Sequence, residues 1–238
     1  QTLDDEFWGE KTWEKAESKI IKETVNTVIS KSGIPTSEID CMFAGDLLNQ
    51  CISSSFGLRE ENIPFFGVFG ACSTFVESMI LGSIAVEGFA NNVLCATSSH
   101  FCSAEKQFRF PLELGNQRPP SSQWTVTGSG AAILSKNGTG PYITHVTPGK
   151  IVDMVLAELK PYCGENDAII DCGNSHFTDT QRRVLELKGS NIHFMASSVF
   201  STFHPKCEIQ IMISHFFFFF KKVAVSKAVF IGSRYLIG

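Results

Sequence analysis

Hydrophobic and polar residues follow the periods of helices and strands in turn along the first part of the chain. From residue 13 to residue 32, apolar positions recur every three or four residues, which predicts a helix that ends at Gly33. The other elements predicted before His100 are a buried strand at 41–44, strands at 63–69 and 92–97, and helices at 47–60 and 72–90. Strands that alternate with helices indicate an α/β domain built in layers.

The pattern is less regular after His100. Residues 101–123 contain three prolines and are expected to form a long loop. Strands are predicted at 124–126 and 131–135, joined by a turn at 127–130. Asn137-Gly138 is typical of a hairpin turn, so 142–146 is expected to return alongside 131–135.

The pattern of hydrophobic and polar residues changes twice in the last third of the chain. A helix at 151–162, a strand at 168–171 and a charged helix at 179–188 are predicted, and we interpret Asp179, Arg182 and Arg183 as a solvated helix face. From about residue 199 the hydrophobic residues follow neither the helix period nor the strand period, and 216–220 is a run of five phenylalanines. Residues 199–238 are therefore expected to be a hydrophobic, low-complexity tail.

Composition excludes several classes of protein. With 20 Lys and Arg against 24 Asp and Glu, the chain has no basic excess, so no nucleic-acid partner is expected. None of the eight cysteines forms a C-x-x-C pair, which disfavours zinc and thioredoxin-like sites. We expect no metal and no cofactor, reduced thiols and an intracellular location. No apolar run reaches the roughly 18 residues that a membrane-spanning helix needs, and the polar N-terminus is expected to begin inside a longer protein.

The segment Gly70–Thr74 carries the most specific chemistry. Cys72 lies between a predicted strand and a predicted helix, where the first helical N–H groups have no partner within the helix. Such a position lowers the pKa of a thiol and attracts anions. Cys72 is accordingly a candidate nucleophile or part of an anion-binding pocket, and a buried structural cysteine is the third interpretation.

An ordered set of motifs covers a little over half of the chain. The motifs are Ala44–Gln50, Ile63–Gly67, Gly70–Thr74, Thr97–His100, Ala104–Arg109 and Trp124–Ala132. Together they resemble the stage V sporulation protein AD family, which is thiolase-like. The resemblance covers about residues 1–149 and implies a thiolase-like N-terminal half with α/β/α layers. It also implies a homodimer that binds dipicolinic acid, participates in its uptake into the spore, and lies peripherally at the inner spore membrane with integral-membrane partners.

The resemblance places Cys72 at the position of the thiolase nucleophile, inside the ligand pocket. A dianionic pyridine dicarboxylate needs hydrogen-bond donors and positive charge. The expected ligand-binding residues are Cys72, Ser73, Thr74, Ser99, His100, Arg109 and Arg118. Asp46 is expected instead to cap the helix that follows it.

A second resemblance begins near residue 149. Residues 169–183 are similar to 6-phosphogluconate dehydrogenase, and the likeness extends over about 149–188. No G-x-G-x-x-G turn precedes it, and the catalytic residues of that family are absent, so residues 150–198 are expected to be an incomplete α/β segment. We interpret the chain as truncated or chimeric.

The predicted function follows from what the chain lacks. Thiolase-type acyl transfer needs a base and an oxyanion hole, and the family takes its basic histidines from a C-terminal half that is missing here. A non-enzymatic dipicolinate-binding sporulation protein is therefore predicted. The alternatives are a thiolase-like acyltransferase that uses Cys72 and a fragment of an NADP-dependent 6-phosphogluconate dehydrogenase.

Overall fold

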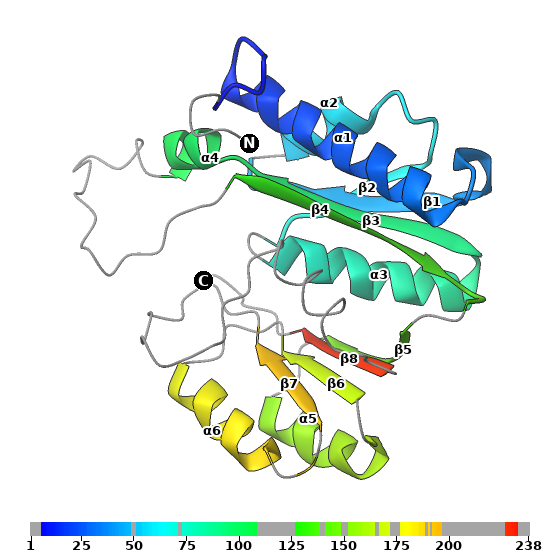
Figure 1. Cartoon of the computed structure of the whole chain (residues 1–238), viewed down its shortest axis with the longest axis vertical. Helices are drawn as coiled ribbons and strands as arrows, with labels where there is room; N and C mark the ends of the chain where they lie inside the picture. The colour runs from blue at the N-terminus through cyan, green and yellow to red at the C-terminus, as the bar shows by residue number, and fades with distance from the viewer. Residues whose placement is uncertain are drawn as a thin grey trace. The chain divides into compact units, whose positions relative to one another are not determined.

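The computed structural model describes residues 6–48, 51–70, 73–108, 127–138, 141–148, 152–164, 167–171, 177–188, 190, 192–196 and 227–232. The chain divides into two compact units, Gln1–Asn137 and Gly138–Gly238 (Figure 1). Each unit has its own sheet and its own hydrophobic core. The expected domain boundaries near 149 and 198 stay predictions.

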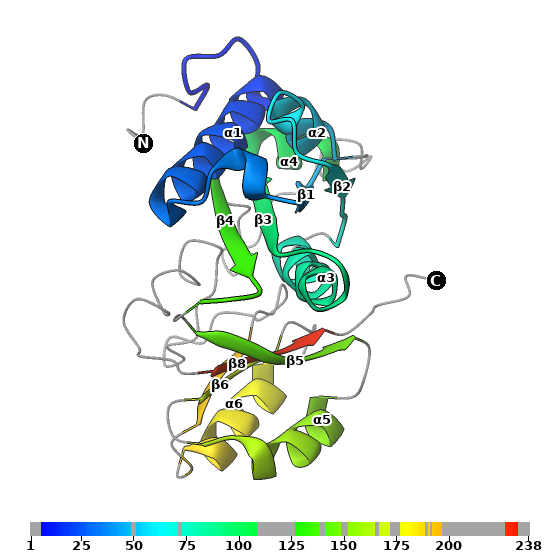
Figure 2. The ribbon, with the colours of Figure 1, turned by 90° about the vertical axis from the view of Figure 1, so that its right-hand side faces the viewer.

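The first unit is a layered α/β structure. Its elements are α1 (Trp13–Ser32), a 3₁₀ turn (Thr36–Glu38), β1 (Cys41–Gly45), α2 (Ile52–Leu58), β2 (Phe65–Gly67), α3 (Thr74–Gly88), β3 (Asn92–Ser99), α4 (Phe101–Phe108) and β4 (Gly128–Ser135). The strand order is β2-β1-β3-β4, in which β4 is antiparallel to β3 and the other pairs are parallel. Helices α1 and α2 cover one face of the sheet and α3 covers the other (Figures 1 and 2). The predicted α/β class is confirmed.

Helix α1 has the bounds that the hydrophobic period predicts. Thr12 caps its start by accepting a hydrogen bond from the Lys15 N–H, and Gly33 ends it in the left-handed conformation that glycine adopts without strain. Ile21 and Val25, on its inner face, pack in the same core as Met42 and Leu94 from the sheet. Burial of this apolar stripe fixes α1 against the strands.

On the other face, α3 lies close to the sheet because several of its inner residues are small. A Cβ on Gly82 would lie 2.8 Å from the Cys95 Sγ and 3.0 Å from Leu134 Cδ1. The lack of a side chain at Gly82 thus allows α3 to approach β3 and β4 closely.

Two predictions in the first unit are wrong. Residues 101–108 form α4 at the start of the expected long loop. The expected turn at 127–130 is largely part of β4, whose residues 128–130 pair with Ser99, Ser98 and Thr97. Small residues such as Gly128 and Gly130 are compatible with either conformation locally, and the ladder with β3 decides between them.

The second unit contains a parallel sheet. Its elements are β5 (Tyr142–Pro148), α5 (Val152–Leu159), a 3₁₀ turn (Lys160–Tyr162), β6 (Asp167–Asp171), α6 (Phe177–Leu187), β7 (His193–Ala196) and β8 (Lys227–Gly232). The strand order is β5-β8-β6-β7, and every pair is parallel. Helices α5 and α6 lie on the same face (Figures 1 and 2). Their apolar residues, including Val155, Leu159 and Leu187, pack with Ile169 of β6.

The second sheet corrects two further expectations. Strand β5 pairs with β8, so it does not return alongside β4 as a hairpin. Residues 227–232 occupy an inner position of this sheet, although 199–238 was expected to be a tail. Both differences arise from pairing between segments far apart in the chain, which local turn signals do not report.

Candidate functional site

The parallel strands of the first unit end at one edge of the sheet. Gly45, the last residue of β1, pairs with Thr97 near the end of β3, and Ala44 pairs with Gly67 at the end of β2. The chain then runs from β2 through Gly70 into the N-terminus of α3. Ligands of open α/β sheets bind outside the carboxyl ends of the strands, so this edge is the candidate site.

Gly45 allows the segment that leads to α3 to pass close over β1. A Cβ at Gly45 would overlap the Val68 carbonyl oxygen and lie 2.6 Å from Thr74 Cγ2. Any side chain at this position would push the β2–α3 connection away from the sheet. The absence of a side chain at Gly45 therefore positions the start of α3.

The hydroxyl groups of Ser73 and Thr74 hold the turn into α3. Ser73 Oγ donates to the Gly70 carbonyl oxygen at 2.7 Å, and the Gly70 N–H donates to Thr74 Oγ1 at 3.1 Å. Thr74 is buried and Ser73 is half-buried. Cys72 lies outside the described residues, so its candidate roles stay predictions.

Ser99 and His100 stand at the end of β3, and both are buried. His100 Nε2 lies 2.6 Å from the Glu6 carbonyl oxygen, and the Cys102 N–H donates to His100 Nδ1 at 3.1 Å. These partners assign the tautomer that carries its proton on Nε2. Both ring nitrogens are thus engaged within the chain.

The structure brings four of the seven expected ligand residues to this edge: Ser73, Thr74, Ser99 and His100. Arg109 and Arg118 lie outside the described residues. Their expected roles stay predictions.

Asp46 was expected to cap a helix that begins immediately after it. The helix begins later, yet the buried carboxylate accepts hydrogen bonds from the Leu48 N–H at 2.8 Å and from the Ser54 N–H at 2.7 Å. Ser54 Oγ also donates to it at 2.7 Å. Ser54 lies in the first turn of α2. Asp46 therefore accepts a hydrogen bond from one of the free N–H groups of that helix, although it lies eight residues earlier in the sequence. Burial raises the pKa of Asp46.

Glu17 is a second buried acid at this end of the sheet, and the sequence analysis missed it. Its side chain is fully buried, and it accepts from Ser98 Oγ at 3.1 Å and from Ser103 Oγ at 2.8 Å. Burial raises the pKa of Glu17 from its ordinary 4.5 to about 7, although these hydrogen bonds act in the opposite direction. The helical spacing could have indicated that Glu17 is buried, because Glu17 lies four residues from Trp13 and from Ile21 on the apolar face of α1.

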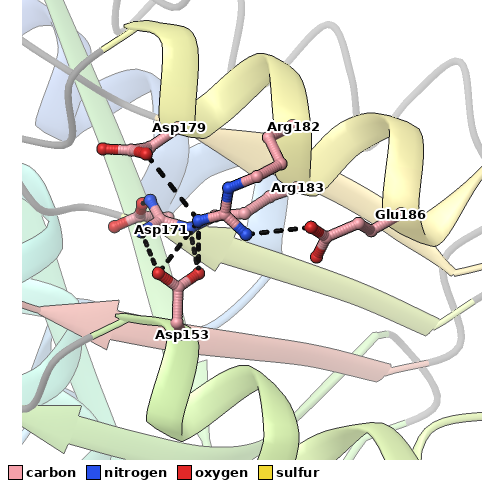
Figure 3. Close-up of polar contacts among 6 residues, drawn as sticks. All are labelled: Asp153, Asp171, Asp179, Arg182, Arg183 and Glu186. Carbon is pink, nitrogen blue, oxygen red and sulfur yellow. Dashed lines mark hydrogen bonds and ion pairs between the residues drawn. The ribbon is translucent and has the colours of Figure 1, made fainter.

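In the second unit, Arg183 ties two helices to the sheet (Figure 3). Its Nε donates to Asp153 Oδ1 of α5 at 2.8 Å, and its Nη1 lies 3.6 Å from Asp171 Oδ2 of β6. Arg183 and Asp171 are both buried. The solvated-face interpretation is therefore wrong for Arg183, because its partners come from elements that helical periodicity does not reveal.

Arg182, next to Arg183 on α6, pairs at the surface. Its Nη2 donates to both oxygens of Asp153 at 3.0 Å, and its Nη1 donates to Glu186 at 2.9 Å (Figure 3). The side chain is 44% exposed, as expected for a solvated position. The hydrogen bonds from Arg183 and then Arg182 lower the pKa of Asp153 to about 2.

A surface groove of about 580 Å³ lies between α1 and α2, away from the candidate site. It is lined by residues of both charge signs, and Lys22 pairs there with Glu60 at 2.7 Å. Positive and negative groups offset one another in this groove, so it does not favour a dianionic ligand.

Two kinds of site are absent from the described residues. They contain no group of three or more His, Cys, Asp or Glu side chains placed to hold a metal ion. In the part of the chain that the structure describes, no helix is long and apolar enough to span a bilayer.

Comparison with known proteins identifies a family whose match covers most of the chain. A sequence model of the family described as "Stage V sporulation protein AD" matches residues 1–187. The chain is 39% identical over 186 residues to the Bacillus subtilis protein of that name, a match that covers 76% of this chain and 54% of the relative. The chain thus spans about half the length of this curated relative.

Two further similarities are a short sequence match and a structural likeness at low sequence identity. The chain is 48% identical over 54 residues to the NAD(+)-dependent, decarboxylating 6-phosphogluconate dehydrogenase of Bacillus subtilis, over 12% of that enzyme. Among solved structures, a tetronic acid condensing enzyme, AbyA1, aligns with a TM-score of 0.46 and 13% identity over 75% of this chain and 70% of the other. A likeness at that level carries no argument about fold or function.

Proposed function

The chain belongs to the stage V sporulation protein AD family, and from this premise we propose that it is a sporulation protein that binds dipicolinic acid and participates in its uptake into the spore. The family match over residues 1–187 is the observation that carries the proposal. The binding partner comes from the resemblance, and the arrangement of the sheet edge supports it.

A dianion would lie against the N-terminus of α3. A helix of 15 residues directs free N–H groups and partial positive charge toward its N-terminal end. Ser73 and Thr74 fix the turn at that end, while Ser99 and His100 lie at the end of the neighbouring strand β3. We propose that Cys72, Arg109 and Arg118 complete the pocket, with the arginines pairing with the two carboxylates. His100 would exchange one of its present partners for the ligand.

We propose that the protein acts by binding and not by catalysis. The chain spans 54% of its sporulation relative, and its dehydrogenase-like match spans 12% of that enzyme. A thiolase-like acyltransferase would form an acyl adduct on Cys72, and mass spectrometry after incubation with an acyl thioester would detect it. We expect alkylation by iodoacetamide at most, with no acyl adduct.

The family resemblance also supplies the proposed location. We place the protein peripherally at the inner spore membrane, where integral-membrane sporulation partners would pass dipicolinate to or from it. This proposal rests on the resemblance alone.

Aspartate at position 72 is expected to weaken dipicolinate binding at least tenfold. A carboxylate at a helix N-terminus stabilises the helix and competes with an incoming anion for the same N–H groups. Cys72→Asp should therefore stay folded while the dissociation constant, measured by calorimetric titration, rises. Cys163→Asp in the second unit is the matched control and should bind as the unmodified chain does. If Cys72→Asp bound dipicolinate with unchanged affinity, the ligand would not bind at the start of α3.

We further propose a homodimer that forms through the outer edge of β2. Strand β2 is at the end of the strand order, and Phe66 and Phe69 beside it are 48% and 49% exposed. An open edge with exposed aromatic residues is a pairing surface. Phe69→Glu is expected to raise the dimer dissociation constant at least tenfold by analytical ultracentrifugation. Phe89→Glu, at a residue that is 74% exposed at the end of α3, should leave it unchanged. A monomer in the unmodified chain would contradict the proposal.

A further inference from the structure

The buried carboxyl group of Glu17 lies where four elements of the first unit meet. It comes from α1, and the hydroxyl groups of Ser98 on β3 and Ser103 on α4 contact it. Ser53 of α2 faces the same carboxyl group, but its buried Oγ has no hydrogen-bond partner among the described residues. The charged group that acts on Glu17 from the segment after β1 is the Asp46 carboxylate.

The hydrogen bonds of Ser103 require a proton on Glu17 if all of them are to form at once. Ser103 Oγ lies 2.8 Å from Glu17 Oε2 and 3.1 Å from the His100 carbonyl oxygen. A hydroxyl group has one hydrogen, so it can donate to only one of these two acceptors. When Glu17 is protonated on Oε2, it donates to Ser103 Oγ, and Ser103 then donates to His100. Glu17 Oε1 remains free to accept from Ser98.

Asp46 differs from Glu17 in having two fixed backbone donors. It receives the Leu48 N–H and the Ser54 N–H, and it also receives the Ser54 hydroxyl, which lies 3.2 Å from the Cys51 carbonyl oxygen as well. This surrounding matches an ionised carboxylate, which only accepts. Two carboxyl groups that are close and buried do not both ionise readily. The donors therefore place the negative charge on Asp46 and the proton on Glu17.

We propose that Glu17 is a proton switch: its neutral form links α1 to β3 and, through Ser103, to the turn at His100 that begins α4, and loss of its proton loosens this link. In the ionised state Ser103 turns its hydrogen to Glu17, and the His100 carbonyl oxygen keeps only the Ala104 N–H. The switch concerns the folded unit itself and does not depend on the identity of the ligand.

The direction of the pH effect follows from the two states of the chain. The pKa of Glu17 is about 7 in the folded chain and 4.5 ordinarily, because burial penalises the charged form and Asp46 adds repulsion. Below pH 4.5 both folded and unfolded chains hold the proton, and the full stabilisation is present. Between 4.5 and about 7 only the folded chain holds it, so stability falls as pH rises. Above about 7 the contribution of Glu17 no longer changes.

Glu17→Gln is the test, because glutamine mimics the neutral acid: its Oε1 accepts from Ser98 and its Nε2 donates to Ser103. Urea unfolding at pH 5 and pH 8 should show that the folding equilibrium constant of the variant, relative to the unmodified chain, rises at least tenfold between the two values. Asp46 is present in both proteins, so the ratio reports the titration of Glu17 together with its repulsion from Asp46. Glu23→Gln, an exposed position on the same helix, should give a ratio that does not change with pH.

Two direct measurements on the chain complete the test. Carbon-13 NMR of the Glu17 carboxyl group should titrate near pH 7, and a midpoint below 5 would overturn the proposal whatever the variant does. Hydrogen exchange of the Ala104 amide, corrected for the intrinsic effect of pH, should accelerate between pH 5 and pH 8 in the unmodified chain but not in Glu17→Gln. Equal acceleration in both proteins would also overturn it.

Discussion

Arg183→Met is expected to destabilise the second unit by about 3–5 kcal/mol, which is the usual cost of removing one partner of a buried ion pair. Methionine preserves much of the aliphatic volume, so loss of packing contributes little. The substitution leaves the fully buried Asp171 without the guanidinium that lies 3.6 Å away, and it removes the Nε and Nη2 hydrogen bonds to Asp153. Hydrogen exchange of the β6 amides, which are buried in this unit, measures the loss.

Arg182→Met is the matched control for Arg183→Met. It is the adjacent residue of α6, and it also pairs with Asp153, but its side chain is 44% exposed. Exposed ion pairs contribute about 0–1 kcal/mol, so the control should lose no more than that. Equal effects of the two substitutions would show that Arg183 is a surface residue and that α6 does not pack on β6 as described.

Gly45→Ala is expected to destabilise the first unit by about 3 kcal/mol, at the upper end of the usual cost of overpacking. The added methyl group would overlap the Val68 carbonyl oxygen, which belongs to the backbone and cannot rotate away. The β2–α3 connection would have to move, and the start of α3 would move with it. Urea unfolding followed by tryptophan fluorescence reports on this unit, because Trp8 and Trp13 both lie in it.

Gly88→Ala controls for the change of residue type in Gly45→Ala. Gly88 is at the end of α3, and a Cβ there would meet nothing within 4 Å. Alanine has the higher helix propensity, so this variant should be within about 0.5 kcal/mol of the unmodified chain or slightly more stable. If Gly45→Ala were equally stable, the segment from Val68 to Thr74 would not cross β1 at close range.

Long elements with their own start and stop signals could be predicted from the sequence. Helix α1 was predicted to the residue, because its apolar period and Gly33 agree. Strand β1 was predicted as a buried strand and β3 as a strand. The pairing of β5 with β8 could not be predicted, because the two strands are separated by some 80 residues and no local signal links them.

The candidate site was predictable where it depends on chain order. A strand followed by a helix places Ser73 and Thr74 at the same sheet edge as Ser99 and His100, and the structure has this arrangement. The roles of Glu17 and Arg183 were not predictable in the same way. Each is an ionisable side chain on a helix, a kind that is mostly exposed, and its partners come from strands and helices in distant parts of the sequence.

Calorimetric titration of dipicolinic acid into the folded chain at neutral pH tests the central proposal most directly. Saturable binding of one ligand per chain is predicted, with binding of the 3,5-dicarboxylate isomer at least tenfold weaker because its carboxylates diverge. Circular dichroism on the same sample establishes that the protein is folded. A folded chain that releases no heat of binding, or that binds both isomers equally, would contradict the account.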